Sequence, residues 1–79
     1  MVERAQVEKV FREVFQLPDD VDVPSLAYRQ RPEWDSVGHM QLIAALETEF
    51  DVMLETDEVI DMSSFDKAVE ILERHLVHA

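Results

Sequence analysis

The chain has 79 residues, contains no cysteine, and carries 7 Lys and Arg against 18 Asp and Glu, a formal net charge of −11 at pH 7. A chain this short forms a single domain, residues 1–79, whose core is too small for a complete metabolic active site. The missing cysteines exclude disulfides, thiolate metal sites and a cysteine nucleophile, while the acidic surface disfavours nucleic acid and favours partners with basic patches.

Residues 3–16 form the first predicted helix. Val7, Val10, Phe11 and Val14 recur at the i, i+3, i+4, i+7 spacing of an amphipathic helix. The same stretch mixes charged and apolar residues, so it lacks the uninterrupted apolar segment of a signal peptide. No part of the chain approaches the roughly 20 apolar residues of a membrane span. We therefore expect a cytoplasmic protein without membrane contact.

Residues 17–35 form a long predicted loop. Three prolines interrupt it, and Pro18 ends the first helix near residue 17 because proline disfavours helical geometry in the preceding residue. Loops of this length in small domains are functional or disordered. We expect an ordered loop, with Trp34 as a hydrophobic staple or anchor and apolar side chains pinning it to the core: Val21, Val23, Leu26 and Tyr28.

The second predicted helix covers residues 36–50, with Asp35 or Ser36 as its cap. At about 100° per residue, one wide side of this helix gathers the residues expected to face the core: His39, Leu42, Ile43, Leu46 and Phe50. Val37, Met40 and Ala44 lie on the opposite side, bordered by polar residues. A second apolar strip of this kind favours a surface that meets partners.

Two further helices are expected after residue 51. Thr56 is the expected cap of a short helix with acidic residues in its first turn. Ser63 and Ser64 open the last helix, and Asp66 completes a pattern that resembles a capping box with Ser63. The chain is thus expected to be all-α, a small four-helix bundle of three longer helices and one short helix, with the long loop between the first two.

The segment Trp34–Val52, WDSVGHMQLIAALETEFDV, resembles the region around the modified serine of acyl carrier proteins, whose core motif is Asp-Ser-Leu. The lengths of the predicted helices and of the long loop are similar to the carrier-protein plan over essentially the whole chain. The acidic excess also fits, because residues 35–79 carry 11 acidic and 2 basic side chains. Val37 departs from the leucine of the motif, and Glu33 and Trp34 replace a small, glycine-containing approach.

The resemblance implies a non-catalytic carrier. A phosphopantetheinyl transferase attaches a 4′-phosphopantetheine arm to Ser36, and Asp35 assists this metal-dependent modification. Acyl or aminoacyl groups travel as thioesters on the arm, between enzymes that load, elongate and transfer them in fatty acid, polyketide or nonribosomal peptide biosynthesis. The front of the second helix is less acidic than in fatty-acid carriers, which favours a dedicated set of partners. A monomer without a metal site of its own is expected.

The resemblance also assigns roles to residues around Ser36. Val37 and Met40 supply apolar contacts to partners, and the acidic residues that pair with basic patches on partners are Glu47, Glu49 and Asp51. A carried acyl chain shelters between helices in a space lined by Leu46, Leu54, Val59 and Met62, four residues that fit ordinary core packing equally well. Gly38, which costs about 1 kcal/mol in a helix relative to alanine, would permit close approach of a partner or of the arm.

Two other functions fit the same residues. The first is an acidic helical adaptor that keeps the fold and binds partners without an arm. The second is a small hydrolase using Ser36 and His39, which are three positions apart on a helix, although no carboxylate is placed to orient the histidine. The acidic run 51–61 lacks the ligand spacing and central glycine of a calcium-binding EF-hand loop.

Overall fold

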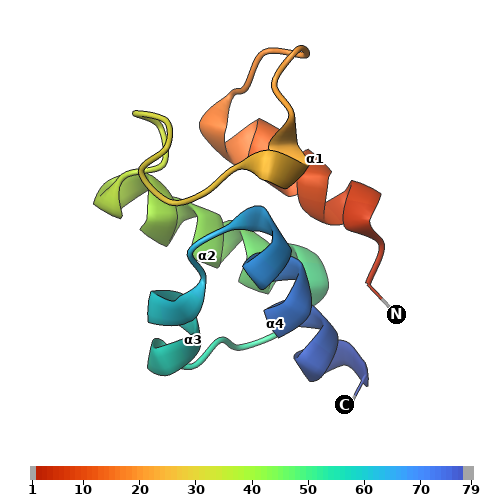
Figure 1. Cartoon of the computed structure of the whole chain (residues 1–79). Coiled ribbons are helices and arrows are strands. Elements are labelled where there is room, and N and C mark those ends of the chain that lie inside the picture. Colours follow the sequence, from red (N-terminus) through yellow and green to blue (C-terminus); the bar gives the residue numbers. More distant parts are fainter. Residues whose placement is uncertain (1, 78–79) are drawn as a thin grey trace.

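The computed structural model describes residues 2–77, with side chains through residue 76. Within that range the chain is all-α, as predicted, and contains no β-strand beyond an isolated bridge. Figure 1 shows its elements in order: α1 (Arg4–Phe15), the 3-10 helix η1 (Val23–Ser25), α2 (Ser36–Phe50), α3 (Thr56–Asp61) and α4 (Phe65–Val77). Each helix lies within about two residues of its predicted position. In the described range, no helix combines the length and the apolar character that crossing a membrane requires.

The buried side chains form one cluster, built mainly from α1, α2, α4 and the segment between α1 and α2, with Leu54 and Met62 from the connections on either side of α3. Phe11 lies at its centre, with ring centroids 5.3 Å from Trp34 and 5.2 Å from Phe65, both in edge-to-face geometry. Such aromatic pairs add about 0.5–1.5 kcal/mol each beyond the area they bury. The predicted core side of α2 is correct at Leu42, Ile43 and Leu46, which are buried, while His39 and Phe50 are half-buried.

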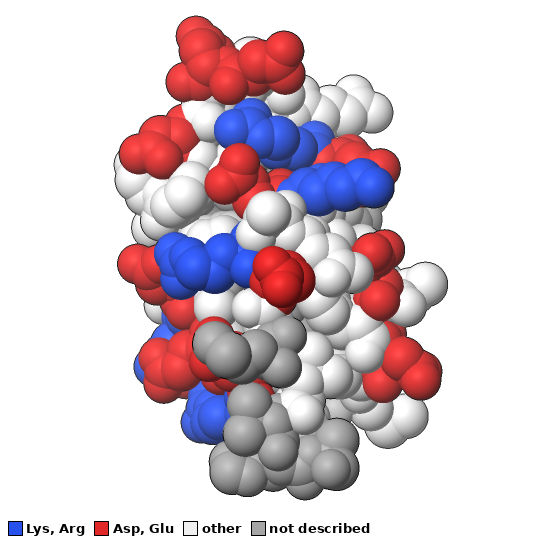
Figure 2. All heavy atoms as spheres, turned by 90° about the vertical axis from the view of Figure 1, so that its right-hand side faces the viewer, with Lys and Arg blue, Asp and Glu red and all other residues white. Residues whose placement is uncertain are grey.

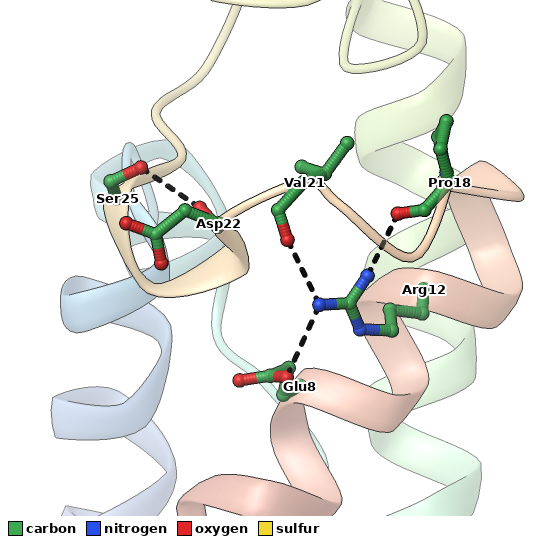
Figure 3. Close-up of polar contacts among 6 residues, drawn as sticks. All are labelled: Glu8, Arg12, Pro18, Val21, Asp22 and Ser25. Carbon is green, nitrogen blue, oxygen red and sulfur yellow. Dashed lines mark hydrogen bonds and ion pairs between the residues drawn. The ribbon is translucent and has the colours of Figure 1, made fainter.

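Residues 16–35 leave α1 at the top of Figure 1, pass through η1 and return to the start of α2 on the left. Arg12 fixes the beginning of this segment, as Figure 3 shows. Its guanidinium donates to the carbonyl oxygens of Pro18 (3.0 Å) and Val21 (2.9 Å), while Glu8 pairs with it from the preceding turn (3.4 Å). The half-buried arginine therefore satisfies two loop carbonyls that no helix or sheet would pair.

A second set of backbone bonds ties the same segment to the junction between α3 and α4. The amide of Tyr28 donates to the Ser63 carbonyl (2.8 Å), and the amide of Phe65 donates to the Leu26 carbonyl (3.0 Å). Val23 and Leu26 are buried, and Tyr28 packs against the core cluster. The expected pinning of the loop by its apolar residues is confirmed.

The caps of α3 and α4 differ from the predicted ones. Glu55, and not Thr56, caps α3, in a capping box where Glu58 accepts from the Glu55 amide (2.9 Å). At the start of α4 the Ser64 hydroxyl accepts from the Lys67 amide (3.0 Å). Asp66 takes no part in that cap and pairs instead with Arg4 (3.0 Å). The cap of α3 therefore lies one residue before the predicted Thr56, and the cap of α4 lies one residue after Ser63.

On the face that Figure 2 presents, Lys and Arg side chains lie among carboxylates. The ion pair Arg4–Asp66, at 3.0 Å, is largely exposed, whereas Lys67–Asp61, at 3.6 Å, joins a half-buried lysine to an exposed aspartate. Exposed pairs contribute about 0–1 kcal/mol each. The few basic residues offset local repulsion and leave the overall acidic charge in place.

Candidate functional site

The start of α2 places Asp35 and Ser36 in different roles. Asp35 is the N-cap, with an extended backbone (φ −104°, ψ −168°) and a carboxylate oxygen, Oδ1, that accepts from the Gly38 amide at 2.8 Å. Ser36 is the first helical residue, and its side chain is exposed. Because the aspartate satisfies the first turn, the serine hydroxyl is not needed as a cap.

Tyr28 lies beside Ser36, and Arg29 lies over the ring of Tyr28. The Tyr28 hydroxyl lies 3.4 Å from Ser36 Oγ, and the Arg29 guanidinium carbon lies 5.5 Å from the centre of the Tyr28 ring. The contact with Ser36, and then the contact with the Arg29 guanidinium, lower the pKa of the Tyr28 phenol below its usual value. The same phenol raises the pKa of the arginine.

Trp34 and His39 pack against the ring of Tyr28. Trp34 is fully buried, as expected of an anchor, and its Nε1 donates to His39 Nδ1 at 2.9 Å. Indole nitrogen only donates, so in the neutral imidazole the proton is on Nε2. That nitrogen lies 2.7 Å from the carbonyl oxygen of Val59, to which it donates. One half-buried histidine thus connects the loop, α2 and α3.

Gly38 makes an internal contact that the sequence did not indicate. A Cβ built on it would collide with the Glu33 carbonyl oxygen and lie 3.2 Å from Phe15 Cε1. The close approach that requires a glycine is therefore that of the chain's own backbone, which corrects the expectation of a partner or an arm at this position. The glycine lets the end of the loop pack directly onto the first turn of α2.

The residues expected to meet partners fall into two groups. Val37 and Met40 are 67% and 58% exposed, as the second apolar strip of α2 predicted. Glu47 is half-buried, and its Oε2 accepts from the Leu54 amide at 2.9 Å. Glu49 Oε2 accepts from Gln6 at 2.9 Å. Asp51 is exposed and ends α2 in the left-handed conformation (φ 54°).

Of the four residues expected around a carried chain, the structure brings two together. Val59 and Met62 line a hollow of about 270 Å³ with an apolar lining, whose rim includes Tyr28 and His39. Leu46 and Leu54 are buried in the core cluster and do not line this hollow. The side chain of Ile60, which also borders it, is 75% exposed.

Ser36 and His39 do not form a hydrogen-bonded pair. Both imidazole nitrogens are bonded elsewhere, to Trp34 and Val59, and Ser36 Oγ contacts Tyr28. The structure therefore does not assemble the nucleophile and base of the hydrolase hypothesis. Among the described residues, no group of three or more His, Asp or Glu side chains is arranged to hold a metal ion.

The sequence predicted Tyr28 as a loop residue that packs on the core, but it did not place Tyr28 beside Ser36 or indicate Arg29 and the His39 bridge. These contacts join residues from different segments, so no pattern within one helix signals them. In comparisons with known proteins, no family model matches this chain and no solved structure does either.

Proposed function

We propose that this protein is a carrier of the acyl carrier protein type, with the four-helix arrangement of that family and Ser36 as the attachment point of a 4′-phosphopantetheine arm. One observation carries the proposal: Asp35 caps α2, so the hydroxyl of the next residue, at the first helical position, is exposed and spared from capping. An exposed hydroxyl with this freedom is accessible to a modifying enzyme.

The surroundings of Ser36 suit a phosphodiester. The first amides of a helix have no acceptor within it, and they attract an anion together with the positive end of the helix dipole. The second carboxylate oxygen of Asp35 has no bond among the described residues, so it is free to assist a metal-dependent transferase. When attached, the arm supplies the thiol that carries acyl or aminoacyl groups as thioesters.

The exposed apolar side chains indicate where partner enzymes dock. Val37 and Met40 lie one to four residues beyond Ser36 and are not needed by the core. Asp51 is the most available of the three expected acidic contacts, because Glu47 and Glu49 already accept internal hydrogen bonds. Partner recognition in this protein therefore relies more on the apolar strip than on the carboxylates at the end of α2.

The hollow beside Tyr28 and His39 is the proposed shelter for part of the arm or its cargo. Its lining is mostly apolar, and Val59 and Met62 contribute to it. At about 270 Å³ it suits a short acyl group better than a long chain, because pockets for drug-sized ligands measure about 300–1,000 Å³.

Co-expression with a phosphopantetheinyl transferase, followed by intact mass spectrometry, tests the attachment. We expect the mass of the arm on the wild type and on Ser25→Ala, a control that removes another exposed serine hydroxyl. The Ser36→Ala variant should stay unmodified. A wild type that remains unmodified with several transferases would contradict the proposal.

A second candidate is an adaptor that uses the same exposed side chains without an arm. It is favoured by the exposure of Val37 and Met40, which does not depend on any modification. In that case Ser36→Ala keeps full biological activity, whereas Met40→Glu abolishes it. Met53→Glu is the matched control, since Met53 is 81% exposed and lies outside α2.

A further inference from the structure

Two arginines lie near Asp35, the residue that caps α2, in a strongly acidic protein. Of the 7 Lys and Arg residues only two follow Asp35. Arg29 and Arg31 line, together with Asp35, a surface hollow of about 290 Å³ at the start of α2. Arg31 pairs with Glu33 through two contacts of 3.3 Å. None of the ion pairs among the described residues involves Arg29, so its charge is available.

The backbone holds Arg29 in an uncommon conformation. Its φ is 68°, in the left-handed region that glycine and asparagine adopt at lower cost, and its amide donates to the Trp34 carbonyl at 2.9 Å. Trp34 is itself buried, so this bond fixes the position of Arg29 relative to the core. The arginine side chain lies over the ring of Tyr28.

The Tyr28 hydroxyl contributes a second group at the same place. The ring packs against His39 and Trp34, with centroids at 5.3 and 6.3 Å, and a phenylalanine would make the same contacts. The hydroxyl adds a donor that lies 3.4 Å from Ser36 Oγ. The phenol therefore contacts the oxygen atom that the proposed function makes an ester, and the guanidinium lies over the ring of the same phenol.

We propose that Tyr28 and Arg29 bind the phosphodiester that attaches the arm to Ser36. The phenol donates to a non-bridging phosphate oxygen, and the guanidinium neutralises the single negative charge of the diester. Charged hydrogen bonds of this kind are about twice as strong as neutral ones, and arginine is well suited to phosphate oxygens. This inference rests on the proposed function, and it fixes the base of an otherwise flexible arm on the Tyr28 side of Ser36.

Phosphorus NMR of the arm-bearing protein tests the proposal directly. We expect the phosphodiester resonance of the folded wild type to differ from that of the same protein unfolded in urea. The Tyr28→Phe and Arg29→Gln variants should each shift it toward the unfolded position. Arg31→Gln is the matched control, because it removes a nearby charge that Glu33 already offsets, and its resonance should stay near the wild type.

Tyr28 also gives a second readout, because the chain has only one tyrosine. Titration of the phenolate absorbance reports this residue alone, in an environment that includes Arg29, Asp35 and the His39 ring. A phosphodiester beside the phenol disfavours its ionisation, so attachment of the arm should raise the pKa of Tyr28. The rise should be larger in Arg29→Gln, which lacks the neutralising charge.

The outcomes separate this inference from the proposed function. If mass spectrometry shows no arm on the wild type, both are wrong. If the arm is present but the phosphorus resonance is the same in wild type, Tyr28→Phe and Arg29→Gln, only the role of Tyr28 and Arg29 is wrong. Should Arg29→Gln fold poorly, Arg29→Gly removes the same side chain and suits the left-handed backbone.

Discussion

Residues 16–35 and helix α3 differ in how they are held. The first segment has only the three residues of η1 in a helix, yet it buries Val23, Leu26 and Trp34. Helix α3 is regular, but none of its residues is buried and Ile60 is 75% exposed. Stability within a protein follows burial and protected hydrogen bonds. The irregular segment, residues 16–35, is therefore expected to be the firmer of the two, meaning that its local unfolding costs more free energy than that of α3.

This difference has a meaning for the candidate site. Ser36 follows directly on the firm segment, so its position is set by Trp34, Gly38 and the loop carbonyls. The hollow beside it has α3 as one wall, and the main links of that wall are the His39–Val59 and Glu58–His75 hydrogen bonds. We expect Ser36 to keep a fixed position, while α3, the wall of the neighbouring hollow, moves away at a low cost in free energy.

The largest expected effect comes from breaking the firm segment. Trp34→Ala should lower the free energy of unfolding by about 3–5 kcal/mol, because it empties a fully buried site. Ile60→Ala, on α3, should change it by less than about 0.5 kcal/mol. Urea denaturation measures both free energies. It is followed by far-UV circular dichroism because Trp34→Ala removes the only tryptophan, whose fluorescence would otherwise report unfolding. Equal losses of the free energy of unfolding in the two variants would contradict the expectation that residues 16–35 are held more firmly than α3.

A smaller effect is expected at the contact between the loop and α2. Gly38→Ala should destabilise by about 1–3 kcal/mol, since its Cβ forces the Glu33 carbonyl and Phe15 to move. Helix propensity alone would give the opposite sign, by about 1 kcal/mol. Ala44→Gly, at an exposed position of the same helix, measures that propensity separately. A Gly38→Ala variant more stable than the wild type would show that the packing is loose.

The smallest effect concerns α3 and pH. The Glu55 amide, followed by His75, lowers the pKa of Glu58 below its ordinary value near 4.5. A lowered pKa in the folded state adds stability that is present above pH 4.5 and is lost as the pH falls toward the folded value. The free energy of unfolding of Glu58→Gln should therefore fall below that of the wild type at neutral pH, by less than about 1 kcal/mol. If wild type and Glu58→Gln have the same free energy of unfolding at every pH from neutral down to about 3, the Glu58 carboxylate does not stabilise α3.

The sequence by itself determined the helices and the two sides of α2. Periodic apolar residues, Pro18 and the Asp-Ser pair act within one or two helical turns, so they predict where α1 and α2 begin and end. The burial of Leu42 and the exposure of Met40 follow from the same local geometry. Trp34 was predicted as a hydrophobic staple or loop anchor because it directly precedes the cap of α2, where an apolar side chain commonly packs against the helix.

Only the tertiary structure decided what surrounds Ser36. Tyr28 contacts it, with Arg29 over the Tyr28 ring, because the loop folds back. Gly38 is needed because the Glu33 carbonyl passes close by, and His39 connects segments twenty residues apart. Glu47 and Glu49 accept hydrogen bonds from other segments of the chain for the same reason. Contacts between distant segments depend on the path of the whole chain, and periodicity within one helix carries no information about that path.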